Sequence, residues 1–315
     1  MNINFNNKYI EIIFVLIIST LVCLFGIYYF QSLVSLYPVF FIVLGIKQGL
    51  IYGITTLALS SLLIGYMVDI YSGVFLLIAF GPLTFFIMQG IKRRKKASEI
   101  LSISTLVFLV SIVAIYYSTR NITGVSLIAE LKDAFNEGLS MQIKMLEEYG
   151  LTDFEIFQIK STLQENFKIF LNIIPSMMII ASFIVSYINY LISSLILGKL
   201  GYGVVFIPRF SRFKLPGNII LGISIMILTT ILLSNLEILN SHAVIRNLYV
   251  LGFLAFFLQG LSVIDYKLIE KNIGPILRFL LIAVTITLSS FIGGIIAIIG
   301  VLDVIFDFRK FRKIV

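Results

Sequence analysis

Long apolar runs, separated by short charged patches, constrain the fold of this 315-residue chain more than any other feature of its sequence. The runs are roughly 16–20 residues long, close to the ~20 apolar residues that a helix needs to cross the hydrocarbon core of a bilayer. Counted with Gly and without Tyr, about 61% of the residues are apolar, against ~45–50% in ordinary globular chains. A soluble domain cannot bury that much apolar surface. We therefore predict an all-α, polytopic transmembrane helix bundle.

The hydropathy pattern predicts eight to ten membrane spans. We place them at 10–30, 33–46, 49–67, 73–90, 100–118, 169–197, 218–234, 246–264, 276–291 and 294–308. Turns at Gly45–Gly49 and at Gly293–Gly294 divide two pairs of spans, which leaves open whether these pairs cross fully or are tilted, broken or re-entrant. The first run begins at Ile10 and has no small-residue cleavage site, so we expect it to remain as a helix.

The distribution of Lys and Arg predicts the orientation of the chain. Three basic clusters stand at the ends of spans, at 92–96, 199–214 and 309–313. With ten spans, 18 of the 24 basic residues lie on one side of the membrane and 6 on the other. Because Lys and Arg near span ends favour the cytoplasmic side, we expect both termini in the cytoplasm.

One long polar segment, 119–168, carries eight acidic residues against five basic ones, and we expect it outside the membrane on the external side. Apolar residues that recur every four positions predict one helix with an apolar face: Leu127, Leu131, Phe135 and Leu139. Thr152 with Glu155 three residues later predicts a capping box at the start of a second helix. This helix should continue into the next span, where Pro175 is expected to kink it. The segment is thus predicted to be an external amphipathic helical hairpin.

The sequence has few of the residues that enzymes and metal sites need. Cys23 is the one cysteine, which excludes disulfides and cysteine-based metal clusters, and His242 is the one histidine. The stretch Gly198–Gly203 lacks the Lys-Ser/Thr ending of a phosphate-binding loop. The basic residues lie at span ends and not on a polar surface, which disfavours nucleic acid. We predict a non-enzymatic protein with no cofactor, no metal site and no nucleic-acid partner.

Polar side chains inside the spans are the candidates for a ligand-binding site, because burial of such groups in a bilayer is costly. The expected residues are Gln48, Gln89, Asn172, Ser176 and Asn189. Asn172 and Asn189 lie 17 residues apart on one predicted helix, which is nearly five turns and hence one face. This polar face can either pack against other helices or contact a small solute.

The stretch between Pro208 and Pro216 alternates aromatic and basic residues, and we call residues 208–216 the strap. Its candidates for lipid or partner contact are Arg209, Phe210, Arg212, Phe213 and Lys214. Rings in the membrane interface and cations on lipid phosphates would suit a segment that lies on an anionic leaflet. A docking site for a protein partner is the alternative interpretation.

The C-terminal end holds Asp303 and Asp307 one helical turn apart, followed by Arg309 and Lys310. Carboxylates four residues apart share a helix face. Local ion pairing with Lys310 at the membrane exit is one interpretation of this motif. The other is a contact between Asp303 and a buried basic group or a cytoplasmic partner.

Two motifs resemble the YybS-like family of bacterial membrane proteins, a family without an assigned biochemical function. They are Leu200-Gly201 followed by the strap, and the stretch from Gly300 to Lys310 with its two aspartates. The hydropathy pattern is similar over nearly the whole chain. The resemblance implies a multi-pass protein of the bacterial cytoplasmic (inner) membrane.

The first six spans are similar in layout to the substrate-binding S components of energy-coupling-factor vitamin transporters. The similarity lies in the stretch Gly45–Gly53 and in the basic loop after the fourth span. The first span departs from the family, with only Ser19 and Cys23 where S components carry a motif of small alanines for docking, and residues 200–315 have no counterpart. The resemblance implies a solute-binding region at the N-terminal end.

Three parts follow from these patterns: a six-span region 1–199 that includes the hairpin, a cytoplasmic connection 200–217 that contains the strap, and the C-terminal spans with their basic tail, 218–315. We expect the protein to bind or transport a small solute in an S-component-like manner. The alternative is a non-transporting scaffold or regulatory protein that binds partners through the strap and the tail.

Overall fold

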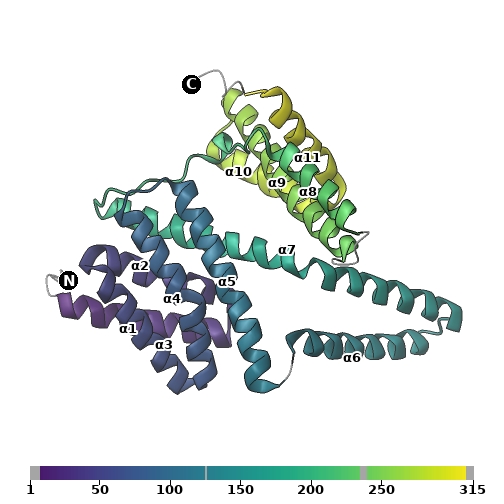
Figure 1. The fold of residues 1–315 in the computed structure, drawn as a ribbon, viewed down its shortest axis with the longest axis horizontal. Coiled ribbons are helices and arrows are strands. Elements are labelled where there is room, and N and C mark those ends of the chain that lie inside the picture. Colours follow the sequence, from purple (N-terminus) through teal and green to yellow (C-terminus); the bar gives the residue numbers. More distant parts are fainter. Residues whose placement is uncertain (1–7, 125, 235–239, 310–315) are drawn as a thin grey trace. The chain divides into compact units, whose positions relative to one another are not determined.

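The computed structural model describes residues 8–124, 126–234 and 240–309. Figure 1 shows that these residues form helices joined by loops, with no strand among them. In chain order the helices are α1 (Lys8–Tyr28), the 3₁₀ helix η1 (Gln31–Leu36), α2 (Tyr37–Gln48), α3 (Leu50–Met67), α4 (Ile70–Lys92), α5 (Ala97–Thr123), α6 (Leu127–Glu148), α7 (Asp153–Lys199), the 3₁₀ helix η2 (Phe210–Arg212), α8 (Ile219–Ser234), α9 (Ser241–Glu270), α10 (Pro275–Thr287) and α11 (Ser289–Phe306). The predicted all-α fold class is confirmed.

Within the described residues, 8 helical segments are long and apolar enough to cross a membrane. They are α1, the joined pair η1 and α2, α3, α4, α5, α7, α9 and α11. Helices α8 and α10 are also apolar but shorter. The predicted range of eight to ten spans agrees with this count, and the chain is a polytopic membrane helix bundle.

One predicted break between spans is wrong. Helices α10 and α11 meet at Leu288, and Gly293–Gly294 lie inside α11. Apolar membrane helices tolerate glycine, and a Cβ added at Gly293 would lie 3.3 Å from the Phe253 ring of α9. Gly293 therefore makes room for a neighbouring ring and does not end a helix. The other predicted turn is confirmed, because α2 ends before Gly49, whose φ of +122° favours glycine.

The chain divides into two compact units. Unit 1 consists of residues 1–167 and 177–207, and unit 2 consists of residues 168–176 and 208–315. Helix α7 contributes to both units. The connection predicted at 200–217 is likewise shared: its first part packs in unit 1, where the Tyr190 hydroxyl donates to the Val205 carbonyl, and the strap packs in unit 2.

The core of unit 1 forms where α2, α3 and α4 pack on one another. A Cβ added at Gly73 of α4 would lie 2.7 Å from the Cα of Gly65 in α3, and one added at Gly53 of α3 would lie 2.9 Å from the Cα of Gly45 in α2. Small residues let membrane helices approach closely, and the resulting van der Waals contact drives their association. Larger side chains fill the space around these contacts: Tyr37, Phe41, Leu57, Ile64, Leu83, Ile87 and Met88.

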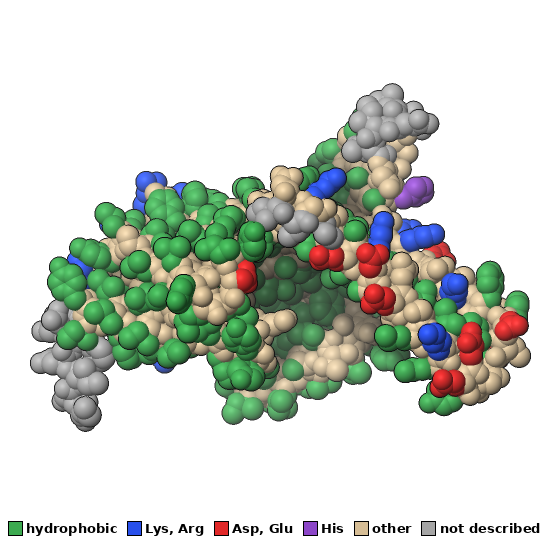
Figure 2. Space-filling view, turned by 90° about the horizontal axis from the view of Figure 1, so that it is seen from below, with side chains coloured by type: hydrophobic (Ala, Val, Ile, Leu, Met, Phe, Trp, Pro, Cys, Tyr) green, Lys and Arg blue, Asp and Glu red, His purple; other side chains and the backbone are tan. Residues whose placement is uncertain are grey.

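Helix α6 and the first part of α7 form the predicted amphipathic hairpin. The Thr152 side chain accepts from the Glu155 backbone N–H, and the Glu155 carboxylate accepts from the Thr152 N–H, so the capping box is confirmed. Part of the apolar face of α6 is covered: the rings of Phe135 and Phe167 stack with centroids 3.9 Å apart and Leu139 is buried, while Leu127 and Leu131 are exposed. In Figure 2 charged side chains gather over this hairpin at the right of the view, while the other helices of unit 1 are mostly apolar. Its placement on the external side stays a prediction.

The core of unit 2 forms where α9 and α11 meet backbone to backbone. A Cβ added at Gly260 of α9 would lie 2.0 Å from the carbonyl oxygen of Ile296, and one added at Gly300 of α11 would lie 1.9 Å from that of Phe256. Neither position has room for a side chain. Phe257, Leu261, Ile296 and Ala297 are buried beside this crossing. The close packing fixes α9 and α11 as the frame on which the strap is held.

Candidate functional site

The strap is held on α9 by two polar side chains of unit 2. Its prolines keep it out of a regular helix, and it forms only the short turn η2. The Ser262 hydroxyl lies 2.7 Å from the carbonyl oxygen of Phe210 and 3.0 Å from that of Phe213. The Gln259 side-chain oxygen accepts from the backbone N–H of Leu215 at 2.9 Å. Helix α9 thus satisfies backbone groups at three points of the strap.

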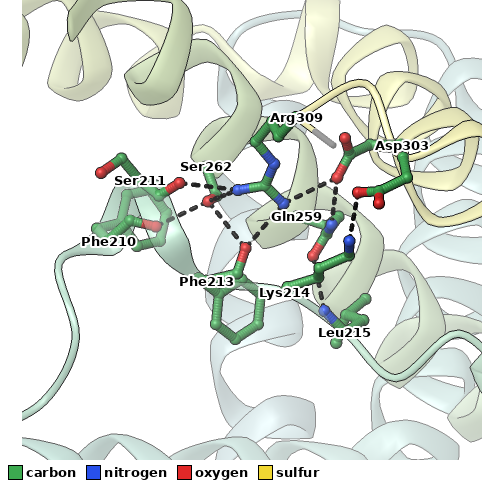
Figure 3. A network of polar contacts seen from close by, with 10 residues as sticks. Phe210, Ser211, Phe213, Lys214, Leu215, Gln259, Ser262, Asp303 and Arg309 are labelled. Atoms are coloured by element: carbon green, nitrogen blue, oxygen red, sulfur yellow. Dashed lines mark hydrogen bonds and ion pairs between the residues drawn. The ribbon is translucent and has the colours of Figure 1, made fainter. Parts of the chain in front are cut away.

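The guanidinium of Arg309 binds the same stretch from the other side (Figure 3). Its Nη1 donates to the Ser211 carbonyl at 2.9 Å and to the Ser262 hydroxyl at 2.8 Å. Its Nη2 donates to the Phe213 carbonyl at 2.9 Å and to the Asp303 carboxylate at 2.8 Å. Arg309 can reach the strap because α11 ends at Phe306. The next residue, Asp307, has a left-handed φ of +50°, which ends the helix two residues before Arg309.

Asp303 joins the two sets of contacts. Its Oδ2 accepts from Arg309 and, at 2.6 Å, from the Gln259 side-chain nitrogen. The side chains of Asp303 and Arg309 are both 0% exposed. A buried charge requires a partner of opposite sign and further hydrogen bonds, and the pair has both. Asp303 Oδ1 has no hydrogen-bond partner within the described residues.

A second ion pair lies next to this network, between Lys214 of the strap and Asp307. The structure therefore brings together the two motifs that the sequence analysis singled out, the strap and the aspartates at the end of α11. Asp303 contacts a buried basic group, Arg309, as one of the two interpretations required. The other interpretation involved Lys310, which lies outside the described residues, as do the basic residues after it. Arg212 of the strap is exposed.

Asn172 and Ser176 take part in a different contact of unit 2, made by Asn247 of α9. The Asn247 side-chain oxygen accepts from the Ser176 backbone N–H at 2.7 Å, and its nitrogen donates to the Asn172 carbonyl at 2.6 Å. These two backbone groups would bond to each other in a regular helix. Pro175 stands between them, and its ring disturbs that pattern. The amide of Asn247 thus satisfies the backbone at the proline.

Asn247 was not singled out by the sequence analysis. Its signal was present, because an amide at the start of an apolar span is costly to bury unless it has partners. What the sequence does not give is the pairing of position 247 with the turn around Pro175, more than 70 residues earlier in the chain.

Asn189 lies in unit 1, on the buried face of α7. Its side-chain nitrogen donates to the carbonyls of Ser35 and Val185, each at 2.8 Å. Its side-chain oxygen is buried and has no partner within the described residues. The hydroxyls of Ser186 and Ser193 share this face and also have no partner there. The predicted polar face of this helix therefore belongs to two separate networks, Asn172 and Ser176 in unit 2 and Asn189 in unit 1.

The two glutamines predicted for the site lie on other helices of unit 1. Gln48 donates to the Glu11 carboxylate of α1 at 2.7 Å, and Lys47 pairs with the same carboxylate. A pocket of about 350 Å³ opens beside Glu11, lined otherwise by apolar side chains of α1, η1, α2 and α7. Gln89 is half-buried on α4 and takes part in neither network. Within the described residues, no group of three or more His, Cys, Asp or Glu side chains could hold a metal ion.

Comparison with known proteins assigns the family. Residues 11–304 match the family described as "Predicted membrane protein (DUF2232)". The chain belongs to this family. It is also 26% identical over 276 residues to the "Uncharacterized protein YybS" of Bacillus subtilis (strain 168), a match that covers 87% of each chain. The predicted resemblance to the YybS-like family is thereby confirmed.

No solved structure matches the chain. The similarity of the first six spans to the S components of energy-coupling-factor transporters therefore stays a prediction. The strap, Gln259 and Asp303 all lie inside the range that matches the family.

Proposed function

We propose that the protein binds a small polar solute inside unit 1, on the face of α7 that carries Asn189. The observation that carries the proposal is the side-chain oxygen of this buried residue, which has no hydrogen-bond partner among the residues that the structure describes. The amide cannot be turned round to remove the problem, because its nitrogen already donates to two carbonyl oxygens. A buried acceptor without a donor is costly, all the more where no water is at hand. A bound N–H or O–H group would satisfy it.

The neighbouring serines support the proposal less strongly. A serine hydroxyl in a helix can rotate to bond the carbonyl four residues earlier, so Ser186 and Ser193 have a route to satisfaction within their own helix. The Asn189 oxygen is an acceptor only and has no such route, because the N–H groups of a helix interior already serve the helix. This difference makes Asn189 the residue to test. The proposal retains S-component-like binding for unit 1 and assigns the protein no catalytic role.

A matched pair of substitutions on α7 tests the proposal. Native mass spectrometry of the gently purified chain should detect a co-purifying small molecule, and Asn189→Leu should reduce its occupancy at least about tenfold, as loss of a buried hydrogen bond requires. Asn172→Leu makes the same change on the same helix but in unit 2, and should leave the occupancy unchanged. Equal loss in both variants, or no bound molecule in wild-type protein, would contradict the proposal.

We further propose that the protein lies in the bacterial cytoplasmic membrane with both termini in the cytoplasm. The asymmetry of Lys and Arg supports this orientation, and so does unit 2, where the strap and Arg309 are in contact and hence on one side. With Cys23 replaced, a cysteine at position 145 should react with an impermeant thiol reagent from outside, and one at position 95 only from inside. Labelling of both positions from the same side would refute the orientation.

The alternative function, a scaffold that binds protein partners through the strap, remains a second candidate. Its specific support is that Arg212 and Phe210 are exposed on a backbone that hydrogen bonds hold in place.

A further inference from the structure

A pocket of about 630 Å³ opens in unit 2 between the strap, the last turns of α9 and the first turns of α10. One wall is polar: Arg209 comes from the strap, Asp265 from α9 and Arg278 from α10. The rest of the lining is largely apolar and includes Phe279 and Ile282 of α10. Phe210 and Ser211 of the strap also line the pocket, and their backbone carbonyls take part in the network around Asp303 and Arg309. The pocket therefore adjoins that network and has charged side chains of its own.

The polar wall carries more positive than negative charge. Arg278 Nη1 lies 3.1 Å from Asp265 Oδ1, and this ion pair fixes the guanidinium in the wall. A guanidinium has five N–H donors, and Nε of Arg278 is buried with no partner within the described residues. Donors thus remain available after the pair with Asp265 has formed.

Arg209 adds a second guanidinium to the wall. It is exposed, and within the described part of the chain its guanidinium has no carboxylate partner. Of the other two cations of the strap, Lys214 is paired with Asp307 and Arg212 does not line the pocket. Two arginines around one carboxylate leave one positive charge uncompensated. Guanidinium groups match phosphate oxygens in geometry and charge, so an anion with a phosphate group fits this wall.

The apolar wall narrows the choice of anion. Phe279 is 72% exposed, and α10 has no buried residue. Its exposed surface is almost entirely apolar: Ile276, Leu277, Phe279, Leu280, Leu281, Val284 and Ile286. A charged pocket that opens beside an apolar helix in a membrane protein suits a molecule with a phosphate at one end and hydrocarbon at the other.

We infer that this pocket binds an anionic phospholipid, with its phosphate on Arg209 and Arg278 and its acyl chains on Phe279 and the apolar surface of α10. The site is independent of the solute proposed for unit 1. Both arginines lie on the side that the orientation above makes cytoplasmic, where anionic lipid attracts basic groups.

The strap provides a matched control, because Arg212 is a second exposed arginine three residues away that does not line the pocket. The full chain is reconstituted in phosphatidylcholine nanodiscs with a minor fraction of phosphatidylglycerol, then released into detergent and weighed by native mass spectrometry. We expect wild type and Arg212→Gln to retain phosphatidylglycerol in preference to phosphatidylcholine. Arg209→Gln should lower its occupancy about tenfold, the loss of one charge-assisted hydrogen bond. Arg278→Lys, which preserves the charge, should lower it less than Arg278→Gln.

Four results would overturn the inference. The first is equal retention of the two lipids by wild-type protein. The second is equal loss in Arg209→Gln and Arg212→Gln, which would indicate a diffuse field and no site. The third is displacement of the lipid by inorganic phosphate, with no lipid retained, which points to a soluble phosphate as the ligand. The fourth is loss of a stoichiometric protein in the Arg209 and Arg278 variants, which points to a protein partner.

Discussion

The buried network of unit 2 and the buried face of α7 in unit 1 differ in how far their polar groups find partners. In unit 2, Asp303, Arg309, Gln259 and Ser262 bind one another and the strap, and Asn247 binds the backbone around Pro175. On the unit 1 part of α7, the side chains of Ser186 and Ser193 and the oxygen of Asn189 have no partner within the described residues. Both arrangements are costly to build in an apolar surrounding. The first repays that cost by joining parts of its own fold, and for the second we propose a partner that comes from outside it.

The largest expected effect of breaking the unit 2 network comes from its buried ion pair. Asp303→Ala leaves the Arg309 guanidinium without its carboxylate, and loss of one partner from a buried pair costs about 3–5 kcal/mol. We expect the free energy of unfolding of the purified protein, measured by denaturant titration in detergent, to fall by that amount.

An exposed ion pair of the same unit serves as the control. The side chains of Lys267 and Glu270 are 53% and 57% exposed, so Glu270→Ala should change the free energy of unfolding by less than about 1 kcal/mol. Equal losses from the two alanine variants would mean that the buried network does not hold unit 2 together.

The next effect concerns the frame on which that network stands. Gly300→Ala puts a Cβ 1.9 Å from the carbonyl oxygen of Phe256, so α9 and α11 must separate. Overpacking of this kind costs about 1–3 kcal/mol. Gly294→Ala makes the same change on the same helix with nothing within 4 Å, and alanine favours helix by about 1 kcal/mol. Thermal unfolding should therefore show opposite shifts for the two variants. If both substitutions destabilised the protein, the loss would come from α11 itself and not from its contact with α9.

A smaller loss than that from the buried ion pair or the helix crossing comes from the amide at the proline. Asn247→Ala leaves the Ser176 N–H and the Asn172 carbonyl without this partner and should cost about 1–2 kcal/mol. In a Pro175→Ala background the cost should be smaller, because those two backbone groups can then bond to each other. A double-mutant cycle of unfolding free energies measures the difference. Identical costs in both backgrounds would show that Asn247 stabilises the protein through other contacts than those with the backbone around Pro175.

Local signals in the sequence predicted much of the fold. Apolar length alone gave the membrane helices, and the capping box at Thr152 followed from two residues three positions apart. The prediction that glycine ends a helix is confirmed at Gly49 and wrong at Gly293–Gly294. In an apolar sequence glycine can either end a helix or make room for a neighbouring side chain. The sequence does not distinguish these uses.

The site was less predictable, because its contacts join distant positions. The strap and the end of α11 were each singled out, yet Arg309 reaches Ser211 across 98 residues of chain, and neither motif states that it binds the other. The same holds for Asn247. Asn172 and Asn189 share a helix, and helix periodicity placed them on one polar face; only the tertiary packing assigns each to its own unit.

The most direct test of the contrast between the units is an experimental structure of the full chain, purified with its native lipids, at a resolution that shows bound small molecules. We expect a molecule other than water with a donor within about 2.7–3.2 Å of Asn189 Oδ1, while Gln259 and Asp303 Oδ2 contact only the chain itself. If Asn189 Oδ1 were instead bonded to a protein group or to a lone water in every copy, the buried face of α7 would be structural and the proposed solute site would not exist.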